Sequence, residues 1–201
     1  MSRKSKLKPI KHVIIIYCEG FSEVEYFEML RRKYHRGGVT VQTVGIDITA
    51  VKSMKGPKLI QTIIKKINMI QHKQVDGVYA VFDRDDLTDD EVREAFKLAK
   101  RSNIKVIFSS TNFEIWILCH FKFFSRAYTK NELNRILSGK QYFDTDYARF
   151  KGAPYDNLLY DKVSTALTNA RRLAKQKHDP VIDQPFINIQ DYLVEIYGRE
   201  D

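Results

Sequence analysis

Val13-Ile14-Ile15-Ile16-Tyr17-Cys18-Glu19-Gly20 is the stretch of sequence that decides the fold. Its apolar first half is rich in β-branched residues, which is typical of a strand buried on both faces of a parallel sheet. A second apolar run, Val78 to Phe82, leads into Asp83-Arg84-Asp85-Asp86. If these two strands pair in one sheet, several carboxylates meet at its carboxyl edge, an arrangement that favours a divalent metal.

Strands and helices alternate over the first 125 residues. We expect further strands at 39–48 and 104–108, and helices starting at a Ser22/Glu25 capping box, near Pro57 and at Asp89. Gly37-Gly38 is expected to end the first helix, and Asp76-Gly77 to form the turn before the third strand. The pattern predicts an α/β fold whose mostly parallel central sheet is flanked by helices.

Helical patterns dominate the sequence beyond Thr111. Asn112 is expected to cap a helix in which Glu114 is the only charge, so that this helix must be largely buried. Residues 126–201 indicate a mainly helical elaboration, with a long basic helix from about Tyr160 to Lys177 and a last one at 189–197. We therefore divide the chain into a basic tail (1–11), an α/β core (12–125) and a helical part packed on the core (126–201).

The charge balance predicts a polyanionic partner. Lys and Arg number 34 against 25 Asp and Glu, giving a net charge of +9 and a pI near 9.4. Nucleic acid is the commonest partner of so basic a protein, and a merely soluble surface is the alternative. The residues that we expect to contact phosphates lie on the late basic helix: Arg171, Arg172, Lys175 and Lys177. Tyr142, Phe143, Tyr147 and Tyr155 would stack on bases or, as we assume first, belong to the core.

Several classes of protein are disfavoured. Cys18 and Cys119 lie in no zinc-ligand or disulfide pattern. No signal peptide or membrane-spanning run is recognisable, so we expect a cytoplasmic protein without membrane contact. P-loop, dinucleotide-binding, zinc-protease and serine-hydrolase motifs are absent from the sequence.

The chemistry of the carboxylates follows from their spacing. Glu19 comes directly after a strand and before a helix, and Asp83 and Asp85 would project to one side of an extended segment. Two unit charges about 4 Å apart repel by roughly 4 kcal/mol at an effective dielectric of ~20. Mg²⁺ would relieve this repulsion and leave open positions for phosphate oxygens.

Three blocks of sequence resemble the RloB-like proteins: 14–27, IIIYCEGFSEVEYF; 81–86, VFDRDD; and 109–121, SSTNFEIWILCHF. The third block is the most distinctive, although Thr111-Asn112 stands where the family usually has a proline before the aromatic. The resemblance covers most of the chain. It implies the Toprim fold, shared with topoisomerases, DnaG-type primases and OLD-family nucleases, and a setting beside prokaryotic restriction and anti-phage systems.

The resemblance also implies roles for the acidic residues. Glu19 corresponds to the Toprim glutamate proposed as general acid/base and metal ligand, and Asp83 and Asp85 to the metal-binding Asp-x-Asp. Glu23 and Glu114 match positions particular to the family. We expect Glu23 to hold metal or to favour the helix dipole, and Glu114 and Asp86 to form an additional site.

These observations predict a nuclease that uses Mg²⁺, with Mn²⁺ as a substitute, to hydrolyse phosphodiester bonds of DNA or of RNA such as tRNA in antiviral defence. The alternative is a non-catalytic nucleic-acid-binding or regulatory subunit that works beside a partner ATPase or restriction subunit. A polymerase of the primase sort ranks below both. His120 is expected to be a core or capping residue. The number of metals and the oligomeric state stay open.

Overall fold

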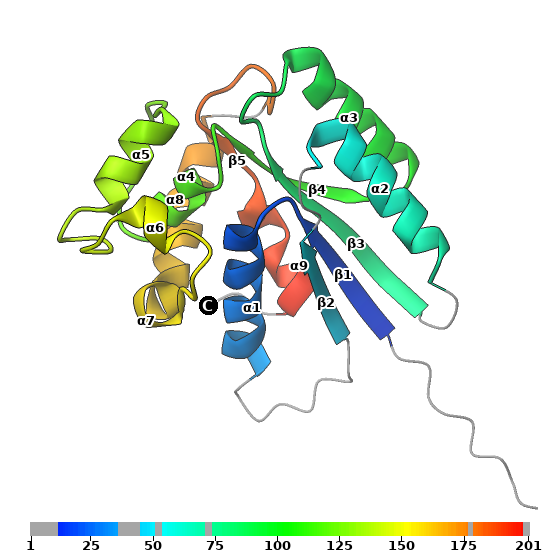
Figure 1. The fold of residues 1–201 in the computed structure, drawn as a ribbon, viewed down its shortest axis with the longest axis horizontal. Helices are drawn as coiled ribbons and strands as arrows, with labels where there is room; N and C mark the ends of the chain where they lie inside the picture. The colour runs from blue at the N-terminus through cyan, green and yellow to red at the C-terminus, as the bar shows by residue number, and fades with distance from the viewer. Residues whose placement is uncertain (1–11, 36–44, 51–53, 71–73, 177–178, 199–201) are drawn as a thin grey trace, which may run out of the picture.

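A computed structural model describes residues 12–35, 45–50, 54–70, 74–176 and 179–198. Within these ranges the centre is a five-stranded sheet in the order β2-β1-β3-β4-β5 (Figure 1). Its strands are β1 (His12–Cys18), β2 (Gly45–Ala50), β3 (Gln74–Asp83), β4 (Lys105–Ser110) and β5 (Phe186–Ile187). The first four pair in parallel and β5 pairs antiparallel to β4. The predicted α/β class with a mostly parallel sheet is confirmed.

Helices follow each of the first four strands and dominate the rest of the chain. The helices that follow these strands are α1 (Phe21–His35), α2 (Gly56–Asn68), α3 (Asp89–Arg101) and α4 (Glu114–Cys119). The later part contributes α5 (Lys130–Leu137), α6 (Tyr147–Phe150), α7 (Asp156–Leu159), α8 (Val163–Ala174) and α9 (Leu193–Tyr197), with 3₁₀ turns at Tyr160–Lys162 and Ile189–Asp191. No helix in the described ranges is long and apolar enough to cross a membrane.

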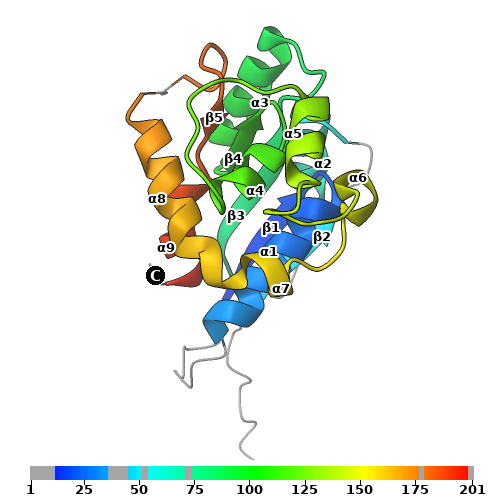
Figure 2. The ribbon, with the colours of Figure 1, turned by 90° about the vertical axis from the view of Figure 1, so that its left-hand side faces the viewer.

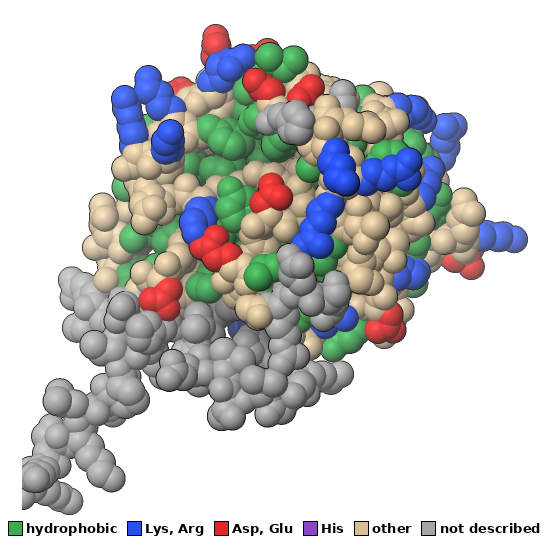
Figure 3. Space-filling model, turned by 180° about the vertical axis from the view of Figure 1, so that it is seen from behind, with side chains coloured by type: hydrophobic (Ala, Val, Ile, Leu, Met, Phe, Trp, Pro, Cys, Tyr) green, Lys and Arg blue, Asp and Glu red, His purple; other side chains and the backbone are tan. Residues whose placement is uncertain are grey.

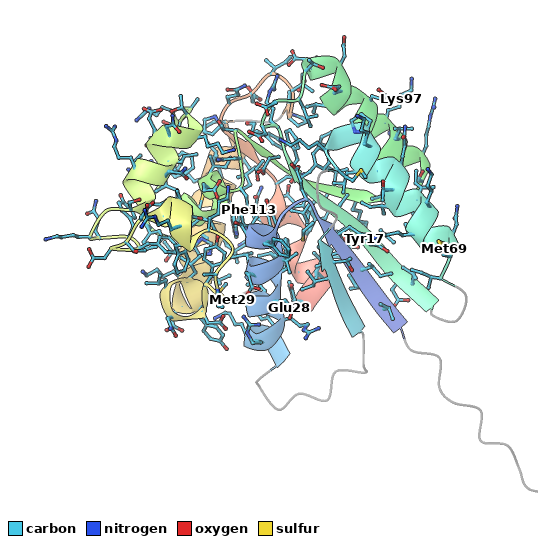
Figure 4. The ribbon with its side chains drawn as sticks, viewed as in Figure 1. Tyr17, Glu28, Met29, Met69, Lys97 and Phe113 are labelled. Atoms are coloured by element: carbon cyan, nitrogen blue, oxygen red, sulfur yellow. The ribbon has the colours of Figure 1, made fainter. Side chains whose placement is uncertain are left out.

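Side chains alternate along β1 between two hydrophobic cores, which explains why this strand reads as a continuous apolar run. Ile14, Ile16 and Cys18 face the core that includes α1 and α4. Val13, Ile15 and Tyr17 face the core under α2 and α3. In Figure 4, Tyr17 lies on the side of α2, whereas Phe113 and Met29 lie on the side of α1.

The C-terminal part is joined to the sheet by main-chain and side-chain hydrogen bonds. Ser109 and Ser110 of β4 pair with Ile187 and Phe186 of β5. The side chain of Asn188 then accepts a hydrogen bond from the N–H of Phe108 at 2.7 Å and donates one to the Val106 carbonyl at 2.9 Å. The outer edge of β4 is therefore covered, as Figure 2 shows for the neighbouring β4 and β5.

Local structure differs from the sequence predictions at three places. The first helix begins at Phe21, so Ser22 lies inside its first turn and does not cap it. Asn112 does not cap α4 either, because that helix begins at Glu114 with Phe113 as its N-cap. Asp76 and Gly77 lie inside β3, where the register with β1 shifts by one residue, instead of forming a turn.

The observed bounds of other elements also differ from the predicted ones. The predicted 39–48 strand is observed as Gly45–Ala50, while 39–44 and the predicted helix end at Gly37-Gly38 lie outside the described residues. The long helix expected over 160–177 is a 3₁₀ turn followed by α8. Two residues, Phe186–Ile187, form a strand too short to leave a periodic pattern.

Candidate active site

The predicted acidic residues converge at the carboxyl ends of β1 and β3. Glu19 directly follows β1, and its N–H donates to the Val81 carbonyl of β3 at 3.0 Å. Asp83 ends β3, and its N–H donates to Oε2 of Glu19 at 3.4 Å. Because these strands are neighbours in the sheet, Glu19 and Asp83 meet although 64 residues separate them in the sequence.

The loop after β3 is tied to the loop after β4. The N–H of Arg84 donates to the Ser109 carbonyl at 2.8 Å, and the N–H of Asp85 donates to the Thr111 carbonyl at 3.0 Å. Asp85 adopts a left-handed backbone with φ of 37°, so the segment is not extended as the sequence argument assumed. These main-chain bonds, and not strand alternation, place Asp85 beside Asp83.

A cavity of about 430 Å³ opens at this edge of the sheet. It is lined by acidic, amide and basic side chains together, namely Glu19, Glu23, Asp83, Asp85, Asn112, Lys55, Lys130 and Lys151. Gly20 leaves room for the carboxylate of Glu23, since a Cβ at position 20 would lie 2.9 Å from Oε2 of Glu23 and would require that side chain to shift. The cavity has the mixed charge expected of a site for a cation and an anion together.

Carboxylates with too few partners lie at the inner wall of the cavity and next to it. Asp83 is half-buried and lines the cavity, whereas Glu114 is 0% exposed and is not one of the lining residues, although Lys151, its ion-pair partner, is. Oδ1 of Asp83 and Oε2 of Glu114 accept no hydrogen bond from the residues that the structure describes. Burial and the nearby charges of Glu23, Glu114 and Glu19 raise the pKa of Asp83 well above its ordinary value. Buried oxygens of this kind require a proton or a cation.

Glu23 belongs to the same buried group. Burial, reinforced by the charge of Glu114, raises the pKa of Glu23 to about 7. Burial also raises the pKa of Glu19, against the opposing effects of the Asp83 N–H and of Lys55. Lys151 is the cation of the inner wall, with its Nζ 2.8 Å from Oε1 of Glu114. One lysine faces several carboxylates here, so their charge is only partly balanced.

At the mouth of the cavity, the charges of the carboxylates are better balanced by lysines. Nζ of Lys55 lies 2.6 Å from Oδ2 of Asp85 and 3.9 Å from Oε1 of Glu19. Nζ of Lys130 lies 3.7 Å from Oδ1 of Asp85. Burial would raise the pKa of Asp85, but the hydrogen bond from Lys55 and the charge of Lys130 outweigh it, and this pKa is lowered. Asp85 is therefore ionised and paired with lysines.

The donor set fits a hard divalent cation. Carboxylate oxygens and the amide of Asn112, whose side-chain atoms also lack a hydrogen-bond partner among the described residues, are the ligand types that Mg²⁺ and Mn²⁺ prefer. Across the described part of the chain, no three Asp, Glu, His or Cys side chains are already grouped as a metal site. Side-chain rotation toward the ion would therefore accompany binding, with the oxygens of Asp83 and Glu114 that lack hydrogen-bond partners and the carboxylate of Glu23, whose pKa is raised, as candidate ligands.

Some predicted residues lie elsewhere. The side chain of Asp86 is 92% exposed and does not line this cavity, although its Oδ2 lies 3.7 Å from Lys55. Arg171 and Arg172 belong to the last turn of α8, which Lys175 follows as C-cap, and Lys177 lies outside the described residues.

The packing shows whether the aromatic residues and His120 belong to the core. Phe143, Tyr147 and Tyr155 are buried core residues. His120 is a core residue as expected: its Nδ1 lies 3.0 Å from the Trp116 carbonyl and its Nε2 lies 3.1 Å from the Tyr26 hydroxyl. Burial lowers the pKa of His120 to about 3, so this imidazole is neutral.

Sequence reasoning missed the lysines at the mouth. Lys55 stands just before α2 and Lys130 begins α5, and neither neighbours an acidic motif in the sequence. Their contact with Asp85 depends on how distant loops meet, so no local pattern marks them. Lys151 pairs with Glu114 in the structure.

The metal-free protein is expected to lose stability as the pH rises from about 4.5 to about 7. The pKa of Glu23 is near 7 in the folded state and 4.5 as the ordinary value, so the folded state retains a proton that the unfolded chain releases. Stability is therefore highest below the unfolded pKa and falls by about 3 kcal/mol as the pH passes the folded pKa. Urea unfolding in chelator at several pH values measures this slope.

Mg²⁺ should flatten that pH dependence, because a bound cation takes the place of the proton. Glu23→Gln should make the pH dependence shallower without metal, while the raised pKa values of Asp83 and Glu19 keep part of it. A stability that increases with pH over this range in chelator would contradict the assignment of Glu23 to a buried acidic group.

The fold and the cavity define an α/β protein with a ligand site beyond the carboxyl ends of its parallel strands, where such sheets bind their ligands. The chain belongs to the RloB-like protein family, whose model matches residues 14–196. No curated protein and no solved structure matches it.

Proposed function

We propose that this protein is a Toprim-type nuclease that uses a divalent cation, Mg²⁺ or Mn²⁺, to hydrolyse phosphodiester bonds of nucleic acid. The observation that carries the proposal is the pair of buried oxygens without hydrogen-bond donors, Oδ1 of Asp83 and Oε2 of Glu114, beside the raised pKa of Glu23. Such a group favours a bound cation over the charged, metal-free state.

The buried residues and the residues at the mouth of the cavity would have different roles. Asp83, Glu23 and Glu114 would hold the cation, which supplies electrostatic stabilisation to a phosphate group undergoing hydrolysis. Lys55 and Lys130 at the mouth would bind the phosphate, exchanging their contacts with Asp85 for phosphate oxygens.

Glu19 would move the proton in this mechanism. The N–H of Asp83 orients Oε2 of Glu19, which leaves Oε1 to accept a proton from water or to return it to the leaving oxygen. Burial raises the pKa of Glu19 toward the working range, as general acid/base chemistry at neutral pH requires. This assignment agrees with the role that the family resemblance gives to the residue.

Incubating the purified protein with DNA and with total RNA, each with Mg²⁺, Mn²⁺ or chelator, tests the proposal. We expect cleavage of one substrate class with either metal and none in chelator. Full activity in chelator would reject a metal-dependent mechanism, and the substrate that is cut identifies the class of nucleic acid.

A non-catalytic subunit is the second candidate, and the ion pairs favour it. Asp85 is paired with Lys55, and Glu114 is paired with Lys151, so the described structure can exist without a metal. Such a protein would bind nucleic acid beside a partner ATPase or restriction subunit in anti-phage defence. Nucleic-acid binding without cleavage, under all the metal conditions above, would favour this role.

A further inference from the structure

Two segments of the described chain, 121–140 and 162–176, are strongly basic. They contain nine Lys and Arg residues and a single acidic residue, Glu132, a formal charge of +8 compared with +9 for the whole chain. Figure 3 shows Lys and Arg side chains gathered on the side of the molecule that carries α8. The surface built by these segments therefore suits a polyanion.

The two segments lie against each other. In Figure 2 the loop between α4 and α5 arcs from the side of α8 across to α5. Nδ2 of Asn169 in α8 donates to the Cys119 carbonyl at 2.8 Å, where this loop leaves α4. Further along the loop, the guanidinium carbon of Arg172 lies 3.8 Å from the centre of the Phe123 ring. Helix and loop thus form one continuous surface.

Two arginines on this surface have their guanidinium groups over aromatic rings. Arg172 covers Phe123, and the guanidinium carbon of Arg126 lies 3.9 Å from the centre of the Tyr128 ring. Both arginines are exposed on their outer side, and Nη1 of Arg126 is also held by Oε1 of Glu132 at 3.2 Å. A guanidinium fixed in this way presents a flat, charged outer face on which a base can stack.

The surface leads to the cavity. Oγ1 of Thr111 donates to the Tyr128 carbonyl at 2.8 Å, and the Thr111 carbonyl accepts from the N–H of Asp85 at 3.0 Å. Lys130, two residues beyond Tyr128, lines the cavity. A strand that stacks on Arg126 therefore lies next to the mouth where Lys130 would bind its phosphate.

We propose that the guanidinium strip, defined as Phe123, Arg126, Tyr128 and Arg172, binds unpaired nucleotides of a single-stranded nucleic acid whose backbone continues into the cavity. Bases in a duplex are stacked on one another, so their faces are not accessible to a guanidinium plane, whereas unpaired bases offer a face to it. This inference deepens the proposed function and rests on it for the role of the cavity, while strand binding itself is measured without cleavage.

Fluorescence anisotropy in chelator tests the strip, with labelled single-stranded RNA and DNA oligonucleotides and duplexes of the same length at one fixed salt concentration. We expect the single strands to bind about tenfold more tightly than the duplexes. In the double variant Arg126→Lys/Arg172→Lys the charge is kept and the planes are lost, so single-strand affinity should fall about tenfold while duplex affinity stays within about twofold.

The matched control is Arg93→Lys/Arg101→Lys, which makes the same changes at exposed positions of α3 and should bind as the wild type does. Thermal unfolding of both double variants checks that the fold is kept. Equal affinity for duplex and single strand, or unchanged single-strand binding by the strip variant, would overturn the inference. Single-strand binding without metal-dependent cleavage would support the proposed role of the guanidinium strip and reject the proposed nuclease activity. Cleavage without a preference for single strands would support the nuclease activity and reject the role of the strip.

Discussion

Asp83→Asn is expected to lower metal-dependent cleavage by about 10²- to 10³-fold or more, the range seen when a single electrostatic group is removed from an active site. The substitution keeps the size of the side chain and its place at the end of β3, but removes the charge that would hold the cation. Initial rates of cleavage at saturating Mg²⁺ measure the effect.

The melting temperature of Asp83→Asn tests the electrostatic account of the inner wall. Burial raises the pKa of Asp83, so the ionised carboxylate destabilises the metal-free fold, and its replacement by a neutral amide should leave the melting temperature unchanged or higher. Asp90→Asn, at an exposed position of α3, is the control and should cleave at the wild-type rate. Wild-type cleavage by Asp83→Asn would reject the metal assignment, and a melting temperature well below that of the wild type would contradict the electrostatic account of the inner wall.

Lys151→Met should be among the most destabilising substitutions in the cavity, at about 3 kcal/mol in chelator. Lys151 is the cation paired with Glu114, and Glu114 is 0% exposed, so its loss leaves a buried charge without a partner. The free energy of urea unfolding at neutral pH gives the magnitude.

A double-mutant cycle separates the charge effect from the packing effect. Lys151→Met/Glu114→Gln should recover most of the lost stability, because the buried charge of Glu114 that lost its partner is then removed as well. Lys140→Met, at an exposed position in the same part of the chain, should cost little. If Lys151→Met proves no more harmful than Lys140→Met, the ion pair with Glu114 does not stabilise the cavity.

The sheet was predictable because its strands are covered on both faces. β1 and β3 read as apolar runs since each alternates between two cores, and the helix predicted to start at Asp89 is α3, which begins at that residue. β5 was not predictable, because its two residues form a strand only through tertiary contacts, namely their pairing with the edge of β4 and the hydrogen bonds of Asn188. The cap predicted at Ser22 was wrong because that helix starts one residue earlier.

The acidic half of the site was visible in the sequence and the basic half was not. Glu19 and Asp83 end neighbouring strands, and strand ends are readable from hydrophobic runs. Asp85 reaches the cavity through a left-handed turn bonded to Thr111, which contradicts the extended geometry used to predict it. Lys55 and Lys130 come from elements distant in sequence, so their pairing with Asp85 depends on tertiary structure alone.

The antiparallel pairing of β5 with β4 has a consequence for biosynthesis. Ser109 and Ser110 lead directly into the Thr111 and Asn112 loop of the cavity, and the edge of β4 that faces away from β3 is paired at these residues only when Phe186 and Ile187 are in place. During translation, this wall would stay incomplete until Phe186 and Ile187 have left the ribosome. A nascent chain would therefore reach a finished cavity only late in its synthesis.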